Sequence, residues 1–195
     1  MSEAYAYDED QKYTYADYKA WELKPRERYE LIHGVAYAMA APNTVHQRIL
    51  ITLGSEFHNF LKGKPCEVFI APFDIRLFYE EDETDDTVVQ PDVVVICDSK
   101  RLGTEGGRGA PDLVVEILSP SNSAIEMERK RLLYQDAGIR EYWIVDPRNK
   151  NVNINLLKNG KFKQETLFIN DTICSTVLSG LKMPLSTIFD EITAT

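Results

Sequence analysis

The sequence predicts a mixed α/β domain in which helices flank a central β-sheet. Two observations carry this prediction. Apolar runs without alternation are typical of strands buried on both faces, and amphipathic helical stretches stand before and after a group of consecutive strands. The chain has 195 residues, of which 44% are hydrophobic, and no linker-like segment divides it. We therefore assign a single domain to residues 1–195.

The N-terminal third predicts a short helix, two strands and a long helix, in that order. The short helix is expected near residues 14–21, and His33-Gly34 marks a turn between two strand-like segments in RYELIHGVAYAMA. Residues 44–62 carry apolar side chains at helical spacing and are followed by Gly63. This pattern predicts an amphipathic helix that ends at the glycine.

The remainder of the chain is dominated by strand-like segments. These segments cover residues 68–79, 93–97, 113–118 and 142–145. Asn159-Gly160 then predicts a tight turn between residues 150–158 and 161–169, because both residues tolerate the positive φ angles of a two-residue hairpin loop. Strands therefore come consecutively rather than in strict alternation with helices.

Composition limits the location and the chemistry. No apolar run approaches the roughly 18 residues of a membrane span, and the N-terminus does not resemble a signal peptide, so we expect a cytoplasmic protein that does not enter the membrane. The cysteines Cys66, Cys97 and Cys174 are odd in number, and Cys97 ends an apolar run. We expect buried free thiols rather than a disulfide or a zinc site.

The net charge of −9 argues against a protein that coats DNA with its whole surface. The excess is local, since residues 80–86 hold six acidic side chains. This run is interpreted as a solvated loop between strands, with a cation-binding loop as the alternative. The net charge therefore neither supports nor excludes nucleic acid as a partner.

Glu116 is the first candidate site residue because it interrupts the apolar run of residues 113–118. A lone buried carboxylate is costly, so Glu116 requires a cation, a base or a proton, or else an arginine from elsewhere as a structural partner. Asp112 lies on the same strand at about 13 Å and cannot share an ion with it. If residues 93–97 pair antiparallel with this strand, Asp92 lies opposite Glu116, with Cβ atoms about 5 Å apart. The two carboxylates would then hold one divalent ion.

A third candidate, Lys130, comes from the helix after Glu116. Residues 123–126 form a capping box, which predicts a helix that runs to about residue 137 and ends at Gly138. At about 100° per residue from Ile125, Lys130 falls at about 140°, on the packed side, whereas Arg131 faces water. The alternatives are a lysine that snorkels at the edge of the stripe, and Arg129 as the inward cation.

Five motifs together resemble those of the Uma-two family of putative restriction endonucleases, a branch of the PD-(D/E)XK nuclease superfamily. They are Tyr29-Glu30-Leu31-Ile32-His33-Gly34, Gln90-Pro91-Asp92, Glu116-Ile117-Leu118-Ser119-Pro120-Ser121, Lys130-x-x-x-Tyr134 and Gly138-x-x-Glu141-Tyr142-Trp143. Each motif is weak alone, but their order and spacing are specific, and the resemblance covers about residues 13–190.

The resemblance implies a restriction-endonuclease-like fold in which Asp92 and Glu116 are ligands of Mg²⁺ or Mn²⁺ and a lysine helps to activate water. The usual lysine of the superfamily stands two residues after the acid, where this chain has Leu118. The role would therefore pass to Lys130. Glu30 would complete the metal site from the N-terminal segment. The alternative is that Glu30 has a structural role.

Other candidate side chains have weaker support. His33, His46 and His58 do not show metal-ligand spacing as a set, and we expect His46, at the start of a helix, to cap or pack that helix. Asp74 lies on the preceding strand, at residues 68–79, and is a further candidate to face the site, although we expect its side chain to face elsewhere.

The function predicted on these grounds is a metal-dependent phosphodiester hydrolase, a DNA endonuclease of the PD-(D/E)XK type. Its partner would be nucleic acid, with DNA implied by the resemblance, and a homodimer is left open. The alternatives are a degenerate domain that binds nucleic acid or a protein without cutting, and a hydrolase of a smaller phosphate ester. The intact set of two acids and a lysine favours an enzyme, because a binding module does not require buried charges.

Overall fold

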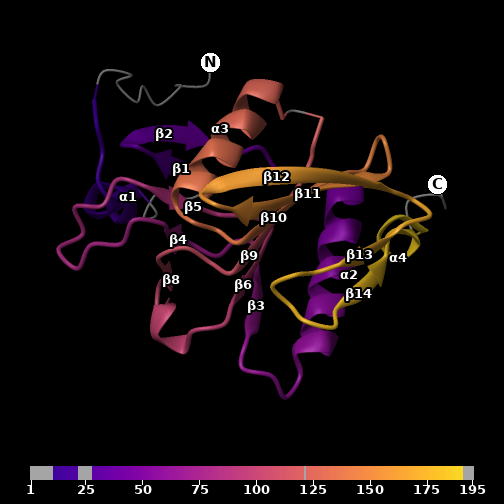
Figure 1. Cartoon of the computed structure of the whole chain (residues 1–195). Coiled ribbons are helices and arrows are strands. Elements are labelled where there is room, and N and C mark those ends of the chain that lie inside the picture. The colour runs from indigo at the N-terminus through magenta and orange to yellow at the C-terminus, as the bar shows by residue number, and fades with distance from the viewer. Residues whose placement is uncertain (1–10, 22–27, 121, 191–195) are drawn as a thin grey trace.

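The computed structural model describes residues 11–21, 28–120 and 122–190. Within these ranges the strands form two six-stranded sheets and a two-stranded sheet (Figure 1). The central sheet has the order β12 (Lys161–Phe168), β11 (Asn151–Lys158), β10 (Glu141–Asp146), β9 (Leu113–Ile117), β6 (Val93–Ile96) and β3 (Glu67–Ile70). The β9 and β10 strands are parallel and the other neighbours in this sheet are antiparallel, which confirms a mixed sheet.

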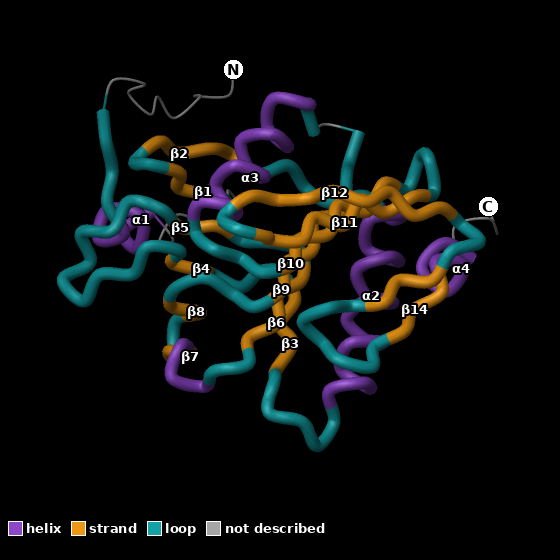
Figure 2. The backbone as a smooth tube through the Cα atoms, in the orientation of Figure 1, coloured by secondary structure: helices purple, strands orange, loops and turns teal. Residues whose placement is uncertain are grey.

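A second sheet, called the side sheet here, lies to one side of the central sheet (Figure 2). Its order is β2 (Val35–Ala38), β1 (Tyr29–Ile32), β5 (Val88–Val89), β4 (Ile75–Arg76), β8 (Gly106–Arg108) and β7 (Leu102–Gly103). The small third sheet pairs β13 (Thr172–Cys174) with β14 (Lys182–Pro184). The helices are α1 (Tyr15–Trp21), α2 (Thr44–Leu61), η1 (Ser99–Arg101), α3 (Ala124–Asp136) and α4 (Leu185–Phe189).

Helices α2 and α3 cover opposite faces of the central sheet. Side chains alternate between the faces along a strand, so Val93 and Val95 of β6 pack with α2, whereas Val94 packs with α3. Strand β9 behaves in the same way, since Val115 belongs to the α2 side and Val114 to the α3 side. Glu116 has the parity of Val114, and this places its carboxylate on the α3 side.

The long helices and the hairpin confirm the sequence-based predictions. Helix α2 begins after Asn43, whose side chain accepts a hydrogen bond from the His46 backbone, and helix α3 begins at the predicted capping box. The β11–β12 turn has φ angles of 51° at Asn159 and 73° at Gly160, as its sequence requires.

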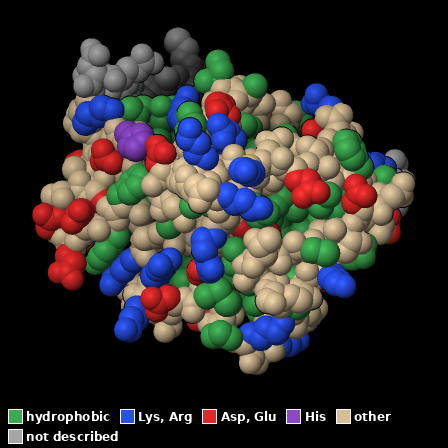
Figure 3. Space-filling view, viewed as in Figure 1, with side chains coloured by type: hydrophobic (Ala, Val, Ile, Leu, Met, Phe, Trp, Pro, Cys, Tyr) green, Lys and Arg blue, Asp and Glu red, His purple; other side chains and the backbone are tan. Residues whose placement is uncertain are grey.

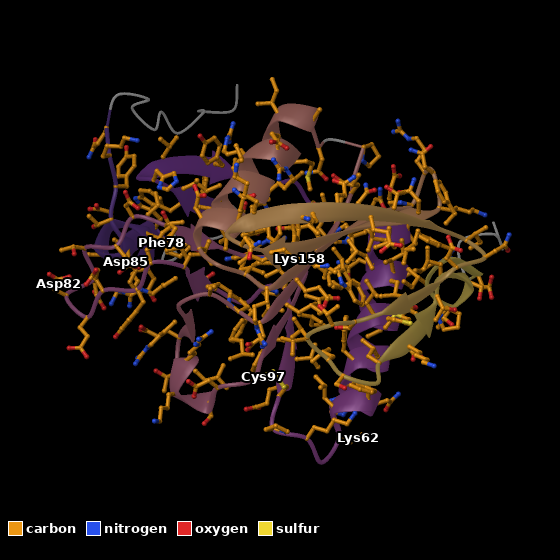
Figure 4. All side chains as sticks on the ribbon, viewed as in Figure 1. Lys62, Phe78, Asp82, Asp85, Cys97 and Lys158 are labelled. Atoms are coloured by element: carbon orange, nitrogen blue, oxygen red, sulfur yellow. A yellow bond between two sulfur atoms is a disulfide. The ribbon has the colours of Figure 1, made fainter. Side chains whose placement is uncertain are left out.

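Two predictions were wrong. Residues 68–79 do not form one strand: β3 ends at Ile70, and the chain passes through Pro72 before entering the side sheet as β4. Proline cannot donate to a strand ladder, so it separates the two segments. Cys66 and Cys97 form a disulfide rather than free thiols. Glu67 pairs with Ile96 in the β3–β6 register, so the flanking cysteines face each other, and Cys97 is labelled in Figure 4.

The Glu141 motif is a structural anchor. Glu141 is fully buried on β10; one carboxylate oxygen accepts the indole N–H of Trp143 at 2.7 Å. The other accepts from the Ser175 hydroxyl, the Thr176 backbone and hydroxyl, and the Val177 backbone, at 2.9–3.0 Å. The carboxylate thus ties the chain after β13 to the central sheet, away from the α3 side.

Candidate functional site

A cavity of about 740 Å³ opens where β1, β2, the start of α2, the end of β9 and α3 meet. The candidate residues Glu30, Asp92, Glu116 and Lys130 all line it, together with His46. Four segments that are distant in the sequence therefore bring the predicted charges to one place. A concave site with convergent charged groups is where chemistry is expected in a protein without a bound ligand.

Lys130 holds the centre of the charged cluster. Its Nζ lies 2.9 Å from Glu116 Oε1 and 2.9–3.0 Å from both carboxylate oxygens of Glu30. The prediction that Lys130 faces inward is confirmed, since the residue is 6% exposed. Glu30 reaches the cluster from β1, and its Oε1 also accepts the backbone N–H of Gln90 at 3.0 Å. The ammonium therefore joins the side sheet to β9.

The packed face of α3 is narrower than the sequence indicates. Ile125, from which the helical angles are counted, is 75% exposed, and the apolar Leu132 is 44% exposed. The buried face consists of Lys130, Leu133 and Tyr134, so Lys130 lies at its middle rather than at its edge. The alternative cation, Arg129, instead places its guanidinium over the Tyr37 ring.

Burial and charge together set the protonation of the cluster. Burial raises the pKa of Glu116 to about 7; the Lys130 charge opposes this rise, whereas Asp92 and Glu30 add to it. Burial alone would lower the pKa of Lys130, but the charges and hydrogen bonds of Glu116 and Glu30 raise it above its ordinary value. Lys130 is therefore an ammonium at neutral pH, and it cannot serve as a ready proton acceptor.

Tyr134 positions Glu116 from the next turn of α3. Its hydroxyl donates to Glu116 Oε1 at 2.6 Å, and burial raises the pKa of Tyr134 well above its ordinary value. The tyrosine is therefore a fixed hydrogen-bond donor. Because Lys130 and Tyr134 both approach Oε1, the orientation of the carboxylate is determined from one side of the cavity.

Asp92 occupies the position predicted from the strand register. Val93 pairs with Val115 in the antiparallel β6–β9 ladder, and extension of this register by one residue sets Asp92 opposite Glu116. Asp92 Oδ2 accepts the backbone N–H of Ile117 at 2.7 Å, next to Glu116 in the chain. The electrostatic effect of Asp92 on the pKa of Glu116 is consistent with this proximity.

Sequence reasoning missed His46. It does more than pack α2, because its Nε2 lies 3.0 Å from Asp92 Oδ1 and its side chain is buried. Asn43 caps the helix and holds the His46 backbone at this position. Within the described ranges, His46 Nδ1 is buried without a hydrogen-bond partner. Because a carboxylate oxygen accepts, His46 Nε2 carries the proton of its contact with Asp92.

The donor set fits a hard divalent ion held by few ligands. Among the described residues, no group of three or more His, Cys, Asp or Glu side chains is arranged to hold a metal. Asp92 and Glu116 are nonetheless opposed carboxylates in a roomy cavity, and Mg²⁺ typically needs one or two carboxylates because it retains several waters. Burial raises the pKa of Glu116, and the nearby Asp92 and Glu30 charges add to this rise; a bound cation would oppose both effects by favouring the ionised carboxylate.

The remaining acidic candidates lie outside this site. Asp112 pairs with Arg140 and accepts the Cys97 backbone N–H, in agreement with its exclusion as a ligand. Asp74 accepts from Tyr18 and Gln90 and does not line the cavity.

The acidic run of residues 80–86 forms a loop at one edge of the molecule, where acidic side chains gather in Figure 3. Asp82 lies at its outer end in Figure 4, whereas buried Asp85 pairs with Arg76 of β4. The interpretation as a loop between strands is confirmed, with one acid serving the fold.

Comparisons with known proteins show the family and the fold to which the chain is similar. An uncharacterized protein of Synechocystis sp. is 30% identical over 139 residues, which are 71% of this chain and 70% of that protein. A crystal structure of a putative nuclease from Anabaena variabilis shares the fold, with a TM-score of 0.72 at 20% identity over 91% of this chain and 98% of that chain. None of the helices in the described ranges combines the length and apolarity needed to cross a membrane. A family model described as "Putative restriction endonuclease" matches residues 15–186, and the chain therefore belongs to the Uma2 family.

Proposed function

We propose that the chain is a Mg²⁺- or Mn²⁺-dependent endonuclease of the PD-(D/E)XK type that hydrolyses phosphodiester bonds in DNA. The observation that carries the proposal is the convergence of Asp92, Glu116 and Lys130 on one cavity. The family match and the nuclease-like fold support it. Asp92 and Glu116 would hold the ion, which when bound would lower the pKa of a water and neutralise charge on the phosphate.

The side chains of the cluster then have distinct tasks. Lys130 supplies a fixed positive charge that would stabilise the negative charge developing on the phosphate. Its raised pKa favours this task over proton abstraction. Tyr134 and Glu30 keep the Glu116 carboxylate and the Lys130 ammonium in place through direct hydrogen bonds.

The test is a cleavage assay on linear and circular DNA and on RNA, with Mg²⁺, Mn²⁺ or EDTA. We expect metal-dependent cleavage that Asp92→Asn abolishes. Cleavage that persists in EDTA, or in the Asp92→Asn variant, would overturn the assignment of this site.

A hydrolase of a small phosphate ester is the second candidate. The net charge of −9 disfavours broad DNA contact, and a cavity of about 740 Å³ is in the size range of small-ligand pockets. Metal-dependent hydrolysis of a nitrophenyl phosphate ester without cleavage of any nucleic acid would favour this second candidate.

The location and the oligomeric state of the protein stay predictions. The Cys66–Cys97 disulfide weighs against the predicted cytoplasmic location, because the cytoplasm is a reducing compartment. The homodimer also stays a prediction.

A further inference from the structure

One part of the cavity wall beyond the charged cluster is apolar. Residues 38–42, which end β2 and lead into α2, line it together with Leu50, Pro72 and Met127. A phosphate would not require such a wall. A nucleobase would, because bases released from stacking bind to apolar and aromatic side chains.

Tyr37 and Arg129 form a cation–π stack within this wall, with the guanidinium over the ring. The Arg129 guanidinium carbon lies 4.1 Å from the centre of the Tyr37 ring, and both residues line the cavity. Tyr37 is paired directly with Glu30 in the β1–β2 ladder, and Arg129 precedes Lys130 on α3. The stack is therefore built from the neighbours of two charged-cluster residues. Aromatic rings and guanidinium planes are the surfaces on which proteins stack unpaired bases.

The charged side chains of the cavity can bind only a small number of phosphate groups at once. Among the described residues that line it, the cations are Arg28, Arg129 and Lys130, and the acids are Glu30, Asp92, Glu116 and Glu126. Lys130 is already paired with two of these acids. Duplex binding depends on many phosphate contacts, and this cavity provides few partners for them. Its volume of about 740 Å³ is in the range that encloses a small ligand, such as one nucleotide unit.

We propose that Tyr37 and Arg129 form a platform on which an unpaired base stacks while its phosphodiester lies at Asp92 and Glu116. The substrate class is then single-stranded or locally unpaired nucleic acid rather than intact duplex. This inference rests on the proposed nuclease function and specifies its substrate.

The experiment separates binding from cutting. Fluorescence anisotropy in EDTA measures binding of a labelled DNA single strand, the same strand in a blunt duplex, and the matching RNA strand; cleavage of each is then measured with Mn²⁺. The variants are Tyr37→Ala, Tyr37→Phe and Arg129→Ala. Arg131→Ala is the matched control, because Arg131 lies on the same helix, pairs with Glu128 and does not line the cavity.

We expect the single strand to bind and to be cut at least about 10-fold better than the duplex, and Tyr37→Ala and Arg129→Ala to weaken single-strand binding about 10-fold. Tyr37→Phe and Arg131→Ala should bind like the parent, which also shows that position 37 tolerates substitution. The RNA strand shows whether the platform discriminates the sugar.

Equal or stronger binding of duplex, or a Tyr37→Ala variant that binds like Arg131→Ala, would overturn the platform. Cleavage that prefers duplex would refute the platform and leave the nuclease assignment standing. Single-strand binding that depends on Tyr37, without cleavage of any substrate, would support the platform and refute the nuclease.

Discussion

In the metal-free protein, Glu116→Gln should remove the loss of folding stability that ionisation of Glu116 causes as the pH rises. The folded protein raises the pKa of Glu116 from 4.5 to about 7, so between these values the folded state binds more protons than the unfolded chain. Stability contributed by this group is therefore present at low pH and is lost as the pH rises towards 7. At about 1.4 kcal/mol for each pH unit, the loss between pH 5 and pH 8 is about 3 kcal/mol.

Glutamine cannot titrate, and it can still accept the Tyr134 hydrogen bond. The free energy of unfolding, measured by urea denaturation in EDTA at several pH values, should therefore decrease more steeply for the parent than for Glu116→Gln. Carboxylates remote from Glu116 titrate alike in both proteins and cancel in the difference. Added Mn²⁺ should reduce the slope of the parent, because a bound cation stabilises the ionised carboxylate. Parallel curves, or a difference that favours the parent at high pH, would refute the reasoning.

Further predictions concern the residues around Glu116. Mg²⁺ or Mn²⁺ should raise the Tm of the parent, and Asp92→Asn should reduce this rise in a thermal-shift assay; an equal rise in both would mean that the ions bind elsewhere. Lys130→Ala should abolish cleavage but retain the metal-induced stabilisation, and should cost the metal-free protein about 3–5 kcal/mol because buried carboxylates lose their cation. A Lys130→Ala variant that cuts like the parent would exclude a catalytic role. His46→Ala should weaken Mn²⁺ binding about 10-fold by calorimetry, whereas His46→Gln, which retains a donor, should largely restore it. Equal affinities in all three proteins would contradict a positioning role for His46.

The central part of the site could be predicted because its residues follow regular periods. Glu116 lies on a short strand and Asp92 directly precedes its antiparallel neighbour, and the helical period groups Lys130 with Leu133 and Tyr134 on one face of α3. The exposure of Ile125 shows the limit of the helical argument, since periodicity gives relative angles but not the direction of the core.

Other features depend on contacts that local patterns do not encode. His46 meets Asp92 only because the first turn of α2 lies at the start of β6, and a single helix does not specify that placement. The disulfide had a usable signal, because pairing β3 with β6 sets Cys66 opposite Cys97. The odd number of cysteines and the apolar run that Cys97 ends point instead to free thiols. The two-residue strands β4 and β5 are too short for any periodicity.

The anchoring of Glu141 determines how far the chain can be shortened. A chain ending before residue 175 would lose the Ser175, Thr176 and Val177 donors. Of the donors described above, the buried carboxylate would keep the Trp143 indole. An ionised group in that position costs several kcal/mol. The smallest stable unit therefore extends at least through Val177, beyond β13, although the cavity lies elsewhere. A shorter relative would need a different residue at position 141, and a neutral apolar side chain is the simplest replacement.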